Sequence, residues 1–125
     1  MSIRGPRQVS PEQFVDAAAA MRPDMLTALA DDVNAGANRK RAAASVKRTA
    51  KWLDACLAAW VAAGMTAPLL APVTGALHAE QRALSARQAA ARDGVAGFAL
   101  TGNSFALNLL RPIDMLDSRH EATEP

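Results

Sequence analysis

Residues 69–102 decide the fold, and they read LLAPVTGALHAEQRALSARQAAARDGVAGFALTG. The segment opens with one apolar run, Leu69–Val73, and ends with another, Val95–Leu100. A threonine and a glycine follow each run directly, and glycine is common in turns, so each run ends at this point. Short apolar runs bounded in this way predict two buried strands.

The segment between the two runs predicts a helix over residues 77–92, because it is rich in alanine and lacks proline. Leu77, Leu84 and Ala91 recur two turns apart, and we expect this face to point inward. A turn at residues 93–94 closes the segment. A helix between two buried strands is typical of a parallel β-α-β unit.

The chain begins this alternation with a helix that starts after Ser10. Ser10 is the expected cap, Pro11 suits the first helical position, and Gln13 completes a capping box. We expect the helix to end near residue 21. Its predicted inward face consists of Phe14, Val15, Ala18 and Met21.

A third apolar run, residues 25–29, comes next, and a short buried strand is expected there. A long helix is then predicted over residues 41–63. Its apolar residues recur at spacings of three and four and form one stripe, made of Val46, Ala50, Leu53, Leu57, Trp60 and Val61.

The order of elements is therefore a helix followed by three strand–helix units, the last helix covering residues 105–111 after Ser104. This alternation predicts an α/β fold with a parallel sheet. We expect an N-terminal extension over residues 1–9, a folded segment over 10–111 and a polar tail over 112–125. Three such units cannot close an eight-stranded barrel, so a barrel of this kind would be represented only in part.

Composition narrows the classes of protein. Alanine accounts for 30 of the 125 residues, which favours helix and leaves few large apolar side chains for a core. Cys56 is the only cysteine, which excludes an intrachain disulfide. Residues 55–79 carry no Asp, Glu, Lys or Arg, but prolines and glycines interrupt them, so we expect a helix end and a strand rather than a membrane span. The N-terminus has no secretory signal, and a cytoplasmic location is expected.

Several segments resemble, in their order and spacing, the tRNA-guanine transglycosylase family. The most specific is residues 45–57, SVKRTAKWLDACL. The supporting segments are RGPRQVSPEQF at 4–14, MRPD at 21–24, EQRALSAR at 80–87 and VAGFALTG at 95–102. The resemblance covers about residues 4–104 and is strongest to the eukaryotic accessory, non-catalytic subunits of queuine tRNA-ribosyltransferase.

This resemblance implies a fold and a function. The family is a TIM (β/α)8 barrel with an inserted zinc subdomain, and its catalytic subunit exchanges guanine for queuine at the tRNA wobble position through an aspartate nucleophile. The chain resembles the middle of that barrel, about three βα units preceded by a helix. The parts of the family with the essential aspartates and the zinc ligands have no counterpart in it. No cofactor is therefore expected in this chain, whereas zinc is expected in full-length relatives.

The resemblance also assigns three strand-end loops. In catalytic members these loops read Phe-Asp-Glu-Cys, Gln-Gly-Gly and Gly-Gly-Leu, and they contact or line the site of the base. The corresponding positions are Ala30 and Asp31 in the first loop, Thr74 and Gly75 in the second, and Thr101 and Gly102 in the third. Ala30 stands where the base-binding aspartate is expected. Each lost hydrogen-bonding partner costs about 1–3 kcal/mol, so the resemblance predicts no base exchange and no catalytic residue.

A basic stretch, residues 39–51, holds six Lys or Arg and no acidic residue. Contact with tRNA phosphates is one interpretation, carried by Lys40, Arg41, Lys47 and Lys51. The alternative is a solvated outer helix face, because no aromatic side chains interleave for base stacking.

Other single residues allow two interpretations each. Asp31 and Asp32 suit either an acid–base or metal pair or, more simply, a turn. Trp60 is expected in the core, and Trp52, which lies off the apolar stripe, is a candidate for a subunit contact. Cys56 is expected to be an inert buried thiol, and His78 a polar residue at a helix start.

The leading hypothesis is a non-catalytic accessory subunit, or a short form of one, that pairs with a catalytic queuine tRNA-ribosyltransferase subunit and contacts tRNA through the complex. By the resemblance its location is cytoplasmic, including the outer surface of mitochondria. One alternative is a small basic helical nucleic-acid-binding protein. Another is an active transglycosylase with altered loops.

Overall fold

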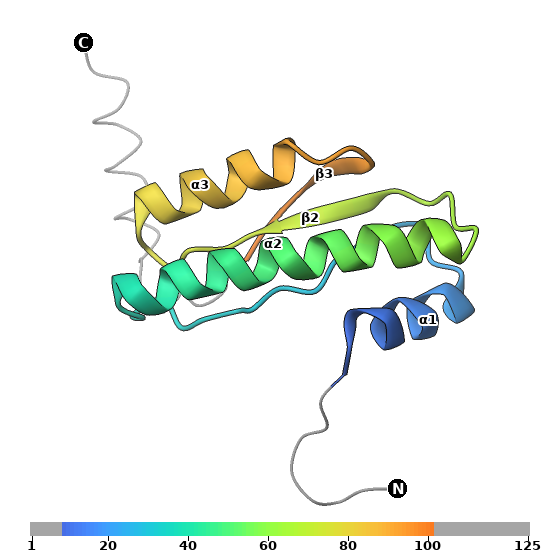
Figure 1. The fold of residues 1–125 in the computed structure, drawn as a ribbon, viewed down its shortest axis with the longest axis horizontal. Coiled ribbons are helices and arrows are strands. Elements are labelled where there is room, and N and C mark those ends of the chain that lie inside the picture. Colours follow the sequence, from blue (N-terminus) through green and yellow to red (C-terminus); the bar gives the residue numbers. More distant parts are fainter. Residues whose placement is uncertain (1–8, 102–125) are drawn as a thin grey trace, which may run out of the picture.

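The computed structural model describes residues 9–101. These residues form three helices and three strands that alternate along the chain (Figure 1). The helices are α1 (Pro11–Met21), α2 (Arg39–Ala62) and α3 (Ala79–Ala90), and the strands are β1 (Leu26–Thr27), β2 (Leu69–Val73) and β3 (Val95–Leu100). The predicted α/β class is confirmed.

The three strands form one parallel sheet in the order β1-β2-β3, so neighbours in the chain are neighbours in space. Helices α2 and α3 lie side by side over the sheet, and α1 packs beside the C-terminal half of α2 (Figure 1). Sequential parallel strands joined by helices are compatible with one sector of a (β/α)8 barrel. A partial barrel remains a prediction.

Local signals explain where the helices begin. Ser10 Oγ accepts a hydrogen bond from the Gln13 backbone N at 3.1 Å, and Gln13 Oε1 accepts one from the Ser10 backbone N at 3.0 Å. This capping box confirms the predicted start of α1. At α2, Asn38 Oδ1 accepts a hydrogen bond from the Arg41 backbone N at 2.8 Å. That cap starts α2 at Arg39, two residues before the predicted position.

The core lies between the helices and the sheet. Leu53, Cys56 and Trp60 of α2 pack there with Val15 of α1 and Leu69 of β2. Seven alanines are also buried, namely Ala18, Ala28, Ala35, Ala42, Ala71, Ala76 and Ala89. Because a methyl group allows close approach of backbones, the high alanine content is used in tight packing between elements as well as in helix formation.

The predicted strands at 69–73 and 95–100 have the observed bounds, but the strand at 25–29 is wrong in length. Only Leu26 and Thr27 pair with β2. Met25 is exposed, and the half-buried Leu29 already belongs to the loop that leads to α2. Residues 25–29 include few strong β-formers, so their low strand propensity does not extend the strand beyond the two residues that pair with β2.

The predicted inward face of α3 is also wrong. Leu77 precedes the helix and is exposed, Ala91 is exposed, and Leu84 is only half-buried. The buried residues of α3 are Ser85 and Ala89. Small side chains are needed there because α3 approaches the end of β2 closely, and Ser85 Oγ accepts a hydrogen bond from the Thr74 backbone N at 3.0 Å.

Three other apolar positions are more exposed than expected. Val61 is exposed because successive helix residues diverge by about 100°, and its neighbour Trp60 takes the inward direction. Met21, in the last turn of α1, is exposed. Strand β3 was expected to be buried, but its residues alternate, and Phe98 faces away from the protein interior with half of its surface exposed.

Some predictions fall outside the described residues. These are the site position Gly102, the helix over 105–111 with its cap Ser104, the tail over 112–125 and most of the N-terminal extension over 1–9. Across residues 9–101, none of the helices combines the length and the apolar character that crossing a membrane requires.

Candidate functional site

The structure brings the three predicted loops to one edge of the sheet. Carboxyl ends of neighbouring parallel strands meet at the same edge, and that is where α/β proteins place their ligand sites. Five of the six predicted positions lie in the described loops at this edge, namely Ala30, Asp31, Thr74, Gly75 and Thr101.

In the first loop, Asp31 is bound tightly by α2. Its carboxylate accepts two hydrogen bonds from Arg41, Nη1 to Oδ2 at 2.7 Å and Nη2 to Oδ1 at 2.9 Å. Arg48 Nη1 lies 3.2 Å from Oδ2. The backbone of Asp31 is bound as well, because its N donates to Thr49 Oγ1 at 3.0 Å and its carbonyl O accepts from Ser45 Oγ at 2.6 Å.

This geometry favours the structural interpretation of Asp31 over an acid–base role. Its hydrogen bonds with Arg41 lower the pKa of the carboxyl; burial opposes this, and the charges of Arg41 and Arg48 lower it further. The group is therefore held as a carboxylate that cannot donate a proton at neutral pH. Asp32 is exposed and takes no part in the contacts of Asp31 with Arg41 and Arg48. Within residues 9–101, no three His, Cys, Asp or Glu side chains come together as a metal site would require.

The second and third loops are joined by Arg82, in the first turn of α3. Its Nη1 donates to the Ala76 carbonyl O at 2.9 Å, and its Nη2 donates to the Thr101 carbonyl O at 3.2 Å. Thr101 is bound to the end of β2, because its N and its Oγ1 both donate to the Val73 carbonyl O, at 3.1 and 2.8 Å. We call this group of contacts the Arg82 clamp.

Sequence reasoning did not single out Arg82. The only signal was its position in the first turn of a helix that follows a strand, where a cation opposes the helix dipole and therefore needs a specific partner. Long-range backbone carbonyls are such partners, but a sequence does not show them.

The second loop packs closely against α3. Gly75 has a φ of 126° and Ala76 a φ of 52°, both in the left-handed region. The Thr74 side chain is almost fully buried, and its Oγ1 has no hydrogen-bond partner among residues 9–101. His78 lies at the end of the second loop, and its Nε2 is hydrogen-bonded to the Ala37 carbonyl O at 2.9 Å, which connects the second loop to the first.

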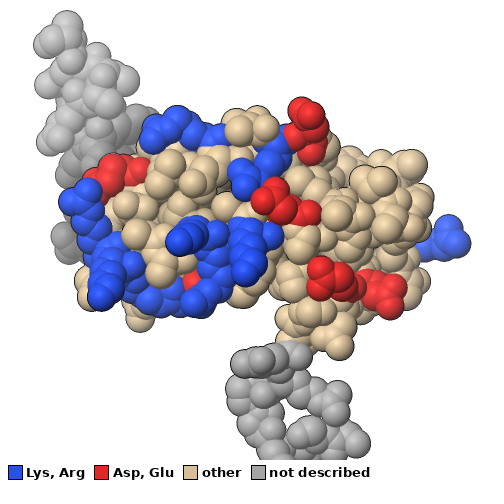
Figure 2. All heavy atoms as spheres, viewed as in Figure 1, with Lys and Arg blue, Asp and Glu red and all other residues tan. Residues whose placement is uncertain are grey.

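The basic stretch on α2 divides by residue type. Its arginines are paired: Arg39 with Glu80 at 3.0 Å, and Arg41 and Arg48 with Asp31. Its lysines are Lys40, Lys47 and Lys51, and none of them has an ion pair within the described residues. All three are exposed, and Figure 2 shows Lys and Arg gathered over the N-terminal half of α2. Of the four predicted tRNA contacts, Arg41 thus has a structural partner, whereas the three lysines are available.

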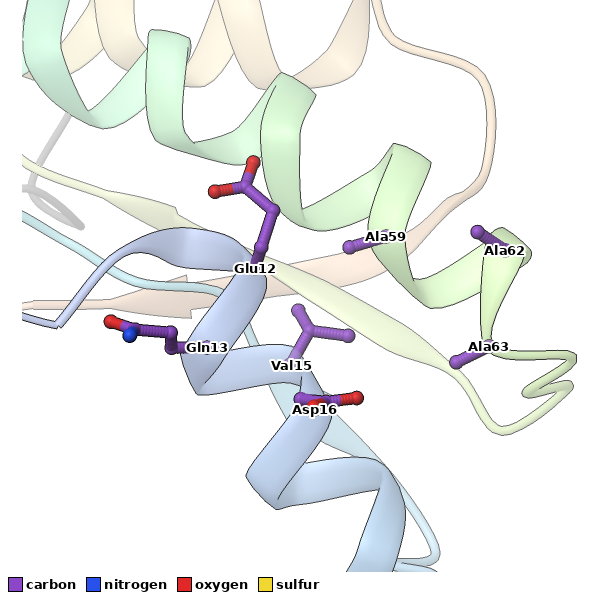
Figure 3. Close-up of a pocket in the computed structure, with 7 residues that line it drawn as sticks. All are labelled: Glu12, Gln13, Val15, Asp16, Ala59, Ala62 and Ala63. Atoms are coloured by element: carbon purple, nitrogen blue, oxygen red, sulfur yellow. The ribbon is translucent and has the colours of Figure 1, made fainter.

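A hollow that sequence reasoning did not predict lies between α1 and α2 (Figure 3). Its floor is apolar, with Val15 facing Ala59, and the carboxylates of Glu12 and Asp16 stand on α1 beside it. The spacing of i and i+4 places both acids on one helix face, a signal that was present in the sequence.

The remaining predicted residues have ordinary environments. Trp60 is in the core and donates from Nε1 to the Ala67 carbonyl O at 2.8 Å, as expected for a buried tryptophan. Cys56 is fully buried, and burial raises the pKa of its thiol, which keeps it protonated. Trp52 is half-buried on the outer side of α2.

Comparison with known proteins identifies the family. The chain matches the model of the queuine tRNA-ribosyltransferase family over residues 1–123. No curated protein matches it. The family is one of pentosyltransferases, so the match supports a role related to tRNA processing and transglycosylation. Because the match extends over nearly the whole chain, the chain belongs to the queuine tRNA-ribosyltransferase family.

Proposed function

We propose that this chain acts as a non-catalytic accessory subunit in tRNA-guanine transglycosylation. The observation that carries the proposal is the loop after β1. Ala30 offers no functional group at the position where the family resemblance expects a base-binding carboxylate. The carboxylate beside it, Asp31, already binds Arg41 and Arg48.

Catalysis would require those contacts to break. A general acid or a nucleophile must present a free group to the substrate. Both carboxylate oxygens of Asp31 accept from Arg41, and separating a partly buried ion pair leaves two unpaired charges. The contacts of Asp31 thus support a structural rather than a catalytic role for this loop.

The other two loops support the same proposal. The Arg82 clamp uses backbone carbonyls of Ala76 and Thr101, atoms that could otherwise face a ligand. Such cross-links rigidify the edge of the sheet and suit a scaffold. In this proposal the partner is a catalytic queuine tRNA-ribosyltransferase subunit, and the lysines of α2 add phosphate contacts with tRNA.

Zinc enters no step of this proposal, because the described residues do not fit a zinc site. Cys56 is buried in the core, and His78 is hydrogen-bonded to a backbone carbonyl. Zinc in full-length relatives and a cytoplasmic or mitochondrial-surface location remain predictions from the resemblance.

Two measurements test the proposed function. The full chain should co-purify with a catalytic queuine tRNA-ribosyltransferase subunit when the two are co-expressed. Labelled guanine should enter tRNA with the catalytic subunit present and not with this chain alone. Failure to co-purify would contradict the pairing, and incorporation by the chain alone would show an active enzyme with altered loops instead.

The alternative of a small helical nucleic-acid-binding protein is not favoured. A three-stranded parallel sheet forms the centre of the described residues, and the family match covers residues 1–123. A circular-dichroism spectrum of the chain should therefore contain a strand component.

A further inference from the structure

The outer side of α2 carries a hollow lined by three cationic side chains and one aromatic side chain. The residues that line it are Ala44, Lys47, Arg48, Lys51 and Trp52. No acidic residue lines the hollow within the described part of the chain. The basic stretch over residues 39–51 contains no aromatic residue, but Trp52, which follows it directly, lines the same hollow as Lys47 and Lys51.

The two tryptophans of the chain have different roles. Trp60 is buried, and its indole N–H is bound to the Ala67 carbonyl O. Trp52 is only half-buried and leaves part of its surface toward solvent. A large aromatic surface exposed beside cations is typical of sites that bind a planar, anionic partner.

Two of the three cations that line the hollow, Lys47 and Lys51, have no ion-pair partner among the described residues. These two lysines are four residues apart on one helix face. Arg48 lies four residues before Trp52 and shares Asp31 with Arg41, which holds that wall of the hollow in place.

We propose that the hollow binds an unpaired nucleotide of RNA, with the base stacked on Trp52 and the phosphates beside Lys47 and Lys51. A single-stranded nucleotide supplies an aromatic face and a negative charge together. An acidic peptide supplies only the charge, and a duplex hides the faces of its bases. The inference rests on the proposed contact with tRNA and specifies which part of the RNA this chain recognises.

Fluorescence of the full chain tests the proposal directly. Titration with a short single-stranded oligoadenylate should change the emission of Trp52, whereas buried Trp60 should not respond. Duplex RNA of equal length and polyglutamate are the competing ligands. We expect the single strand to bind more tightly than either of them.

Substitutions separate stacking from charge. Trp52→Leu should weaken binding of the single strand at least about fivefold and leave duplex binding unchanged, and Trp52→Phe should retain most of the affinity. Lys47→Glu and Lys51→Glu should weaken binding of both RNAs and each lower the salt slope for the single strand by about 0.7. Arg87→Glu, an equal change of charge at an exposed position of α3, is the matched control and should have little effect.

Several results would overturn the inference. They are equal losses of single-strand and duplex binding in Trp52→Leu, tighter binding of polyglutamate than of RNA, or no RNA binding by a folded chain. Each is distinct from failure of the proposed function, which is tested by co-purification with a catalytic subunit. Circular dichroism confirms that each variant is folded.

Discussion

At the scale of single residues, the loop after β2 depends on the absence of a side chain at Gly75. Its φ of 126° is a conformation that other residues rarely adopt. A Cβ at this position would lie 2.7 Å from the Arg82 backbone N and 3.0 Å from the Gln81 carbonyl C. Both atoms belong to the backbone of α3 and cannot rotate away. The close packing of this loop against α3 therefore requires glycine.

Gly75→Ala should lower the free energy of unfolding by about 3 kcal/mol, because backbone strain and overpacking both contribute. Urea unfolding followed by circular dichroism measures the change. Gly64→Ala is the matched control, since Gly64 has a φ of 72° but no atom within 4 Å of its added Cβ. It should cost only about 1 kcal/mol. Equal losses in the two variants would contradict the close contact with α3.

Asp31→Asn should lower the free energy of unfolding by about 1–3 kcal/mol at neutral pH, because Arg41 and Arg48 lose their charged partner. The pKa of Asp31 is lowered in the folded state, so its stabilising effect is present above the unfolded value of 3.8. It is lost as the pH falls through the folded pKa.

The difference between wild type and Asp31→Asn should therefore shrink below about pH 4 in urea titrations at several pH values. Asp32→Asn, at the exposed neighbouring position, should change stability by less than about 0.5 kcal/mol. A pH-independent difference for Asp31→Asn would contradict the role assigned to the carboxylate.

At the scale of elements, sequence patterns predicted what depends on local chemistry. The capping box at Ser10 and the two apolar runs after residue 68 needed no knowledge of neighbours. The inward face of α3 does depend on neighbouring elements. Ser85 is buried and accepts a hydrogen bond from the Thr74 backbone N, whereas Leu84 is only half-buried. The five described loop positions meet at one sheet edge, but their long-range partners, above all Arg82, could not be predicted from periodicity.

Arg82→Gln tests whether α3 holds the ends of β2 and β3 together. The substitution removes the reach of the side chain to the Ala76 and Thr101 carbonyls, so the two loops should open more often. Amide hydrogen exchange should become about tenfold faster at Thr101, whose backbone N–H donates a hydrogen bond to the Val73 carbonyl O at the end of β2. Arg87→Gln, on the same helix but exposed, should leave this rate unchanged. Unaltered exchange in Arg82→Gln would contradict the clamp.

At the scale of the whole molecule, part of the sheet surface within residues 9–101 is exposed. Side chains of β3 alternate between half-buried and exposed, and β3 is the edge strand of the described sheet. Phe98 remains 51% exposed on that face. An edge strand with an exposed aromatic residue favours association with other chains. In the proposed accessory subunit, this surface would meet further strands of a barrel.

The isolated chain should therefore self-associate as its concentration rises, and Phe98→Thr should reduce this association. Threonine retains a high strand propensity, so the sheet should remain while the apolar surface is lost. Sedimentation velocity across a range of concentrations measures the association, and dye binding reports the exposed apolar surface. Leu77→Thr is the matched control, because Leu77 is slightly more exposed, at 58%, but lies in the loop before α3. An equal reduction in both variants would show that the association depends on total exposed apolar surface and would contradict a specific role of β3. If only Phe98→Thr reduces the association, the chains associate through the exposed side of β3 that carries Phe98.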